Sequence, residues 1–173
     1  MLQCIYVMVV IIILNILIMS RKALLNFIKF GCNFDVALIS ITDYNQSHPH
    51  IKTVEHGGIT QICQLKFDDV DDGEGNCITD LDAKTIADFV RSLTTEHLIV
   101  NCEAGISRSS GIAAAIMKAV NGDDMEVFNN YKYFPNMACY RKVLNQFMEI
   151  DEESLARKEE INLRVLKCYY DLD

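Results

Sequence analysis

An apolar run, a small polar loop and an alanine-rich run follow one another between residues 98 and 120 of this 173-residue chain. Leu98–Val100 has the pattern of a buried strand end, and Gly111–Val120 has the composition of a helix. A buried strand that turns into a helix is a basic unit of α/β folds. The sequence therefore predicts a central, mainly parallel sheet flanked by helices on both faces, with its site at the carboxyl ends of the strands.

The loop between the two runs carries Cys102 and, six residues later, Arg108. Such a turn points backbone N–H groups inward and adds the positive end of the helix dipole, which suits a phosphate group. The same field favours the thiolate form of Cys102. Arg108, in the first helical turn, can donate to two phosphate oxygens at once. Ser109 can donate to the sulfur and make it a better leaving group.

These residues carry a resemblance to a known family. The segment Glu103-Ala104-Gly105-Ile106-Ser107-Arg108-Ser109 resembles the phosphate-binding loop of the cysteine-dependent protein tyrosine phosphatases, in particular their compact dual-specificity-like branch in bacteria and phages. The resemblance implies a protein tyrosine phosphatase-like fold, Cys102 as the nucleophile, and a phosphate held by Arg108 and the loop from Glu103 to Ser107. One position departs from the family pattern, because Asn101 stands where a histidine usually precedes the nucleophile.

Loss of the leaving group is helped by a carboxylic acid that protonates its oxygen. In the resembled family this acid is an aspartate on the loop that follows the preceding strand. Matching Leu65–Asp69 to that strand end makes Asp69 the acid, with Asp68 and Asp71 as the alternatives. The rest of the acidic stretch 68–76 is expected to be a solvated loop, because its spacing fails the calcium-loop pattern.

The remaining chain supplies strands and helices for the same fold. Strands are expected over 16–20, 36–42 and 59–67, and helices over 21–27, 79–93, 123–131 and 137–150. In the helix over 79–93, the apolar residues recur at helical spacing and are expected in the core: Leu81, Ile86, Phe89, Val90 and Leu93. We divide the chain into an apolar N-terminal extension (1–14), a phosphatase domain (15–150) and a C-terminal helix (151–173).

Two polar positions are expected near the ends of the later helices. Asp124, with Asp123 before it, can cap the short helix that runs to Tyr131. Asn136 precedes the helix over 137–150 and is either a hydrogen-bond partner of the cysteine loop's backbone or a simple turn residue.

An apolar run over residues 5–19 raises the question of a membrane segment. A spanning helix needs about 20 apolar residues, and residues 16–20 also match the first strand of the domain. Membrane contact through 5–19 is therefore the alternative and not the favoured interpretation. Seven cysteines without framework spacing favour a reducing, cytoplasmic setting. The formal charge of −8 argues against nucleic acid as the main partner.

The sequence thus predicts a phosphomonoester hydrolase that forms a cysteinyl-phosphate intermediate and needs no metal or organic cofactor. The expected substrate is a phosphorylated protein or peptide, carrying phosphotyrosine or also phosphoserine and phosphothreonine. Two alternatives stay open. One is the same chemistry on an RNA 5′ phosphate or a phosphoinositide, and the other is a catalytically weak phosphate-binding module, for which Asn101 is the reason.

Overall fold

The computed structural model describes residues 13–170, so the predicted extension over 1–14 lies outside the described residues except for its last two. The elements in chain order are β1 (Asn15–Ser20), α1 (Arg21–Phe30), β2 (Asp35–Thr42), β3 (Gly58–Lys66), α2 (Asp80–Arg91), β4 (His97–Cys102), α3 (Arg108–Ile116), the π-helical turn η1 (Met117–Asn121), α4 (Met125–Phe128), α5 (Met137–Leu144) and α6 (Glu152–Tyr170). Within this range, no helix combines the length and apolar character that crossing a membrane requires.

Four strands form one sheet in the order β1-β4-β2-β3, and every pairing in it is parallel. All residues of β2 after Asp35 are buried, and so are all residues of β4 after His97. Both strands are nearly continuous apolar runs because a parallel sheet is covered on both faces. The predicted class, an α/β fold with a mainly parallel sheet, is confirmed.

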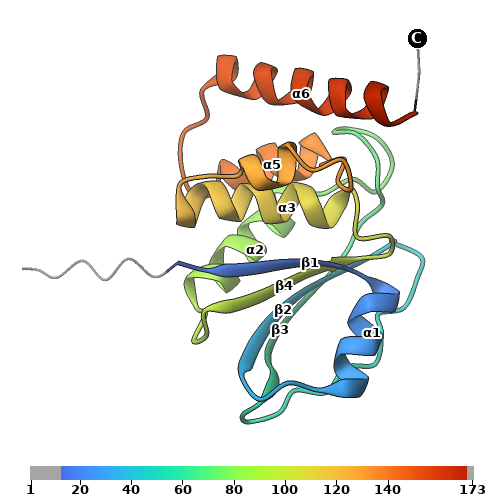
Figure 1. Cartoon of the computed structure of the whole chain (residues 1–173), viewed down its shortest axis with the longest axis vertical. Coiled ribbons are helices and arrows are strands. Elements are labelled where there is room, and N and C mark those ends of the chain that lie inside the picture. The colour runs from blue at the N-terminus through green and yellow to red at the C-terminus, as the bar shows by residue number, and fades with distance from the viewer. Residues whose placement is uncertain (1–12, 171–173) are drawn as a thin grey trace, which may run out of the picture.

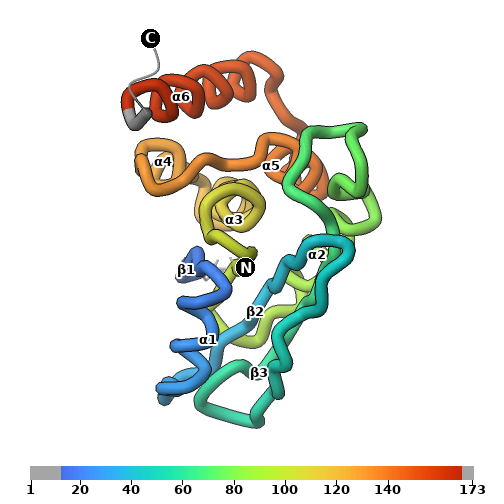
Figure 2. Tube along the Cα trace, turned by 90° about the vertical axis from the view of Figure 1, so that its right-hand side faces the viewer, coloured from blue at the N-terminus to red at the C-terminus, as the bar shows by residue number. Residues whose placement is uncertain are grey.

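Helices cover the two faces of the sheet unequally (Figure 1). Among the described helices, α1 packs alone on one face, where Leu24 joins a small apolar cluster with Leu38 and Ile99. The other face carries α2, α3 and α5, and α6 forms an outer layer beyond α5 and α3 (Figures 1 and 2). Helix α3 is buried along its whole length, which explains why small alanines fill its middle.

Two strand-to-helix junctions lie next to each other at the carboxyl edge of the sheet. Ser20 at the end of β1 is the register partner of Cys102 at the end of β4. Helix α1 begins immediately after Ser20, whereas α3 begins only after the loop 103–107. The second junction carries the residues that the sequence singled out.

Two expectations are wrong, one on a core residue and one on a helix end. Leu81 is 72% exposed, because it lies in the first turn of α2 and the buried face of that helix begins at Ala83. Helix α5 ends at Leu144 and does not continue to residue 150. The carbonyl of Gln146 accepts a hydrogen bond from the side chain of Arg91, and the backbone tightens into i→i+3 turns there.

The short helix expected over 123–131 is confined to α4, and the side chain of Asp124 does not cap it. Asp124 is instead buried, and its carboxylate accepts hydrogen bonds from Tyr140 Oη at 2.7 Å and Lys158 Nζ at 2.6 Å. Burial raises the pKa of Tyr140, and the neighbouring Asp124 carboxylate raises it further. This buried group joins α4, α5 and α6, so α6 is fixed to the rest of the domain.

Candidate active site

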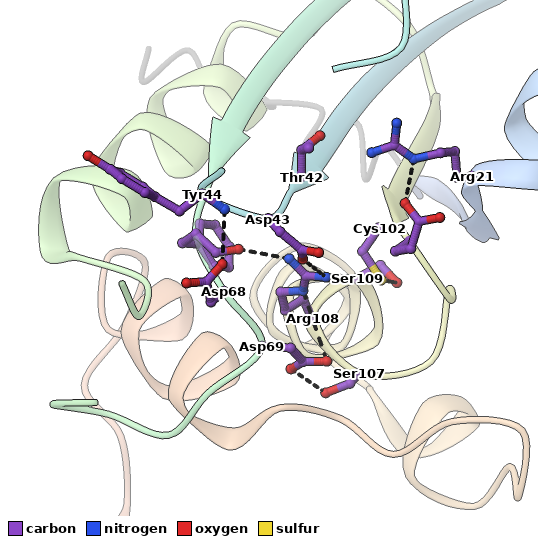
Figure 3. A network of polar contacts seen from close by, with 12 residues as sticks. Arg21, Thr42, Asp43, Tyr44, Asp68, Asp69, Cys102, Ser107, Arg108 and Ser109 are labelled. Atoms are coloured by element: carbon purple, nitrogen blue, oxygen red, sulfur yellow. Dashed lines mark hydrogen bonds and ion pairs between the residues drawn. The ribbon is translucent and has the colours of Figure 1, made fainter. Parts of the chain in front are cut away.

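Cys102 lies at the start of the loop from β4 to α3, with Ser109 beside it (Figure 3), and its sulfur has two hydrogen-bond partners. The Gly105 N–H lies 3.3 Å from Cys102 Sγ, and Ser109 Oγ lies 3.1 Å from it. Cys102 is almost completely buried. Within residues 13–170, no acceptor is recorded for the other N–H groups of the loop, those of Glu103, Ala104, Ile106 and Ser107. Such a set of unpaired amides next to a helix start can bind an anion.

Gly105 allows this loop to pack directly against the neighbouring junction. Its φ is +71°, and a Cβ atom there would lie 2.5 Å from the backbone nitrogen of Ser20. The Arg21 N–H donates to the Glu103 carbonyl, and Arg21 Nε lies 2.5 Å from the Glu103 carboxylate (Figure 3). The end of β1 and the start of α1 therefore pack against the loop and fix its position.

Asn101, which stands in place of the family's histidine, is buried at the end of β4. Its Nδ2 donates to the carbonyls of Met19 at 3.0 Å and Cys102 at 2.9 Å, and its Oδ1 accepts from Ser40 Oγ at 3.3 Å. Asn101 thus links β1, β4 and β2 immediately below the loop. This network gives the residue a structural role beside the sulfur without making it a reacting group.

The guanidinium of Arg108 is fixed on two sides and unpartnered on the third. One amino group donates to the Phe67 carbonyl at 2.7 Å, and the other lies 2.7 Å from Asp43 Oδ1. Nε is buried without a hydrogen-bond partner and lies 4.0 Å from Asp69 Oδ2. An unpaired buried donor costs free energy, and an oxyanion bound beside it would remove that cost.

Asp69 is the only one of the three candidate acids that hydrogen-bonds a residue of the cysteine loop. Ser107 Oγ donates to Asp69 Oδ1 at 2.7 Å, and Asn136 Nδ2 donates to the same oxygen at 3.1 Å. Its second oxygen, Oδ2, faces Arg108 Nε. That second oxygen is the one that can carry a proton to a leaving group.

The two alternative acids lie elsewhere on the same loop. Asp68 accepts hydrogen bonds from the backbone N–H of Tyr44 and the side chain of Asn76, so it holds its own loop in place. The hydrogen bond from the Tyr44 N–H lowers the pKa of Asp68 most, and the one from the Asn76 side chain lowers it further. Asp71 is exposed and lines a cleft beside the site.

Of the two roles that the sequence left open for Asn136, the structure shows the hydrogen bond to the backbone of the cysteine loop. The Asn136 backbone N–H donates to the Ser107 carbonyl at 3.1 Å, and its side chain caps α5 by accepting from Cys139 N. A Cβ atom on Gly111 would lie 2.4 Å from the Asn136 carbonyl oxygen, so α3 and the start of α5 meet at a glycine. The start of α5 therefore supports both the cysteine loop and Asp69.

Asp43 is a site residue that sequence reasoning missed. It directly follows β2, which is adjacent to β4 in the sheet, and this brings its carboxylate to Arg108. A polar residue after a buried parallel strand is a usable signal, because all such strand ends meet at one edge. The sequence gives no information, however, on which strands are neighbours.

Compared with models of known protein families, with curated proteins and with solved structures, the chain shows no match. Among the described residues, no group of three or more His, Cys, Asp or Glu side chains is placed to hold a metal ion. The site thus brings together the thiol of Cys102, the fixed guanidinium of Arg108, unpaired backbone N–H groups and the carboxyl group of Asp69.

Proposed function

We propose that this chain is a cysteine-dependent phosphomonoester hydrolase acting on phosphorylated proteins or peptides, with a fold of the protein tyrosine phosphatase type. One observation carries the proposal. The Cys102 sulfur accepts from Gly105 N–H and shares a hydrogen bond with Ser109 Oγ, in a loop whose amides at Glu103, Ala104, Ile106 and Ser107 are unpaired within the described residues. The buried Arg108 nearby has an unpartnered Nε. Both features favour an oxyanion bound next to the sulfur.

In the first step, the Cys102 thiolate attacks phosphorus, the sulfur–phosphorus bond forms and the bond to the ester oxygen breaks. Arg108 and the loop amides bind the equatorial phosphoryl oxygens, where charge develops in the transition state. Asp69 gives its proton from Oδ2 to the departing oxygen. The donors on Oδ1 from Ser107 and Asn136 keep the carboxyl group oriented for this transfer.

In the second step, a water molecule attacks phosphorus and the sulfur–phosphorus bond breaks. The Asp69 carboxylate, now deprotonated, takes the proton from that water. The Ser109 hydroxyl, 3.1 Å from Cys102 Sγ, donates to the sulfur as it leaves as a thiolate. The products are inorganic phosphate and the regenerated enzyme.

The test is hydrolysis of a chromogenic aryl phosphate by the full chain. We expect turnover that vanadate inhibits, that a chelator leaves unchanged, and that Cys102→Ser abolishes. Turnover that survives in the Cys102→Ser variant would overturn the proposal. Binding of phosphate or vanadate without any turnover would indicate the phosphate-binding module that the sequence left open.

A substrate panel then divides the chemical classes. We expect phosphopeptides to be hydrolysed with a higher kcat/KM than a 5′-phosphorylated oligonucleotide or a soluble phosphoinositide. The observation behind this expectation is the negative charge of the chain and of the cleft that borders Asp69. A higher kcat/KM for the oligonucleotide would replace the protein substrate with a nucleic acid.

A further inference from the structure

A cleft of about 700 Å³ opens beside the site, between the acidic loop 68–76 and α6. Asp69 and Ser107 both line it, so the cleft borders the loop that carries Cys102. Phe134, Met137 and Leu163 give it apolar wall area. A volume of this size is typical of sites that bind ligands.

The charged side chains of the cleft are all carboxylates. Asp71 and Glu74 are exposed, and neither side chain forms an ion pair or hydrogen bond with a described residue. Glu159 on α6 lines the same cleft and pairs with Arg141 at 3.1 Å. Among the residues that the structure describes, no lysine or arginine lines the cleft. The adjoining Asp72 differs, because Lys142 Nζ lies 3.1 Å from it.

A second observation indicates which chemical group can bind next to Asp69. The buried Nε of Arg108 has no partner, and it faces Asp69 at 4.0 Å. An oxyanion bound beside Asp69 and within reach of Arg108 Nε would give that donor a partner. The carboxylates of Asp71 and Glu74 favour a positively charged group elsewhere in the same cleft. One ligand satisfies both requirements if it carries a phosphate group and, a few atoms away, an amine or guanidine.

We propose that this cleft binds the peptide segment next to the phosphorylated residue and selects substrates with lysine or arginine in that segment. The inference rests on the proposed function, because it assumes that the phosphate lies at Cys102. Basic side chains pair with Asp71 and Glu74, while the apolar wall contacts the rest of the segment. A basic flank also offsets the repulsion between a phosphorylated substrate and a chain of net charge −8.

The experiment compares three phosphotyrosine peptides that differ only in the residues on both sides of the phosphotyrosine, which are lysine, alanine or glutamate. The measured quantity is the ratio of kcat/KM for the lysine peptide to that for the glutamate peptide, so a change in basal rate cancels. We expect this ratio to be about five or more in the natural chain, because two partly exposed ion pairs would give a preference of that size. The double variant Asp71→Asn/Glu74→Gln should bring it close to one.

Two further variants sharpen the result. Glu74→Lys should move the preference toward the glutamate peptide. Glu55→Gln is the matched control, because it removes one exposed carboxylate near the opposite edge of the sheet, where Gly57 N–H bonds Asp35. The control should keep the ratio of the natural chain. Equal kcat/KM for all three peptides, or a ratio unchanged in the double variant, would overturn the inference while leaving the proposed hydrolase intact.

If no phosphate ester is hydrolysed, the proposed function fails and the cleft is tested by binding instead. The same three peptides are then titrated against the natural chain, with their affinities measured by calorimetry. Tighter binding of the lysine peptide that Asp71→Asn/Glu74→Gln removes would keep the cleft assignment. Equal affinities, or no binding, would reject it.

Discussion

Two strand-to-helix junctions lie side by side in this molecule, and only one of them has the features of an anion site. At the first, β1 passes directly into α1, and the Ser20 hydroxyl accepts from Ala23 N, which caps the helix. At the second, β4 passes through the loop 103–107 into α3. There the equivalent hydroxyl of Ser107 donates to Asp69 and makes no capping hydrogen bond.

The comparison shows that a helix start alone does not make the site. A serine cap at α1 uses an amide that could otherwise bind a ligand. At α3 the serine is turned toward the acid, the inserted loop adds further unpaired amides, and the cysteine lies at the register position of Ser20. The same supersecondary unit therefore carries a capped helix at one strand and a loop with unpaired amides at the next.

The largest effect is expected from the cation of the second junction. Arg108→Lys keeps the charge but loses the planar guanidinium that joins the Phe67 carbonyl, Asp43 and a bound phosphoryl group. We expect kcat/KM for an aryl phosphate to fall by about a thousandfold. The control, Arg91→Lys on α2, should stay within about twofold of the natural chain. Steady-state kinetics after a thermal-unfolding check measures both, and equal kinetics of the two variants would refute the role of Arg108.

The next largest effect is expected from the acid. Asp69→Asn removes the proton donor, so turnover of a phosphate ester with a poor leaving group should fall by about a hundredfold. Asp71→Asn is the comparison, and an equal loss of rate in both variants would remove the assignment of Asp69.

A smaller effect is expected from the glycine at which the two junctions touch. Gly105→Ala must place a methyl group 2.5 Å from Ser20 N at a positive φ, so the free energy of unfolding should fall by about 3 kcal/mol. Gly122→Ala has a similar φ of +83° but open space around it, so it should cost only about 1 kcal/mol. Denaturant unfolding of the two variants separates crowding from backbone strain. Equal losses would show that the loop is not packed on β1.

The smallest effects are expected from replacing each of the two serines by alanine. Ser20→Ala should lower the free energy of unfolding by about 1 kcal/mol and leave aryl phosphate hydrolysis nearly unchanged, because it removes a helix cap. Ser107→Ala should leave stability nearly unchanged and slow hydrolysis about fivefold, because it removes one hydrogen bond from Asp69. Unfolding and kinetic measurements on both variants should give opposite patterns. A common pattern would mean that the junctions do not differ as described.

Much of this site could be predicted because its residues are contiguous in sequence. The run from Leu98 to Gly111 fixes a strand, a turn and a helix locally, and the Cys102–Ser109 contact follows from that turn. Asp69 lies far from the loop in sequence, and only the resemblance indicated it. The contacts of Asp43 and Asn136 depend on which strands and helices are neighbours, and local periodicity does not contain that information.

In the fold, too, features set by local sequence were predictable and others were not. Buried strands such as β2 were predictable because a continuous apolar run has few alternatives in a parallel sheet. Leu81 and the end of α5 were not. Leu81 lies in the first turn of α2, before its buried face begins, and α5 ends close to the contact between Arg91 and the Gln146 carbonyl. Asp124 has the sequence of a helix cap, yet packing against Lys158 and Tyr140 takes its carboxylate into the core.

The most direct measurement is the location of the phosphoryl group during turnover. The natural chain is mixed with an aryl phosphate, quenched by rapid denaturation, digested and analysed by mass spectrometry. The account predicts a phosphoryl group on Cys102, appearing before steady state and absent from the Cys102→Ser variant. A phosphoryl group on any other residue, or product formation without an adduct on the enzyme, would contradict it.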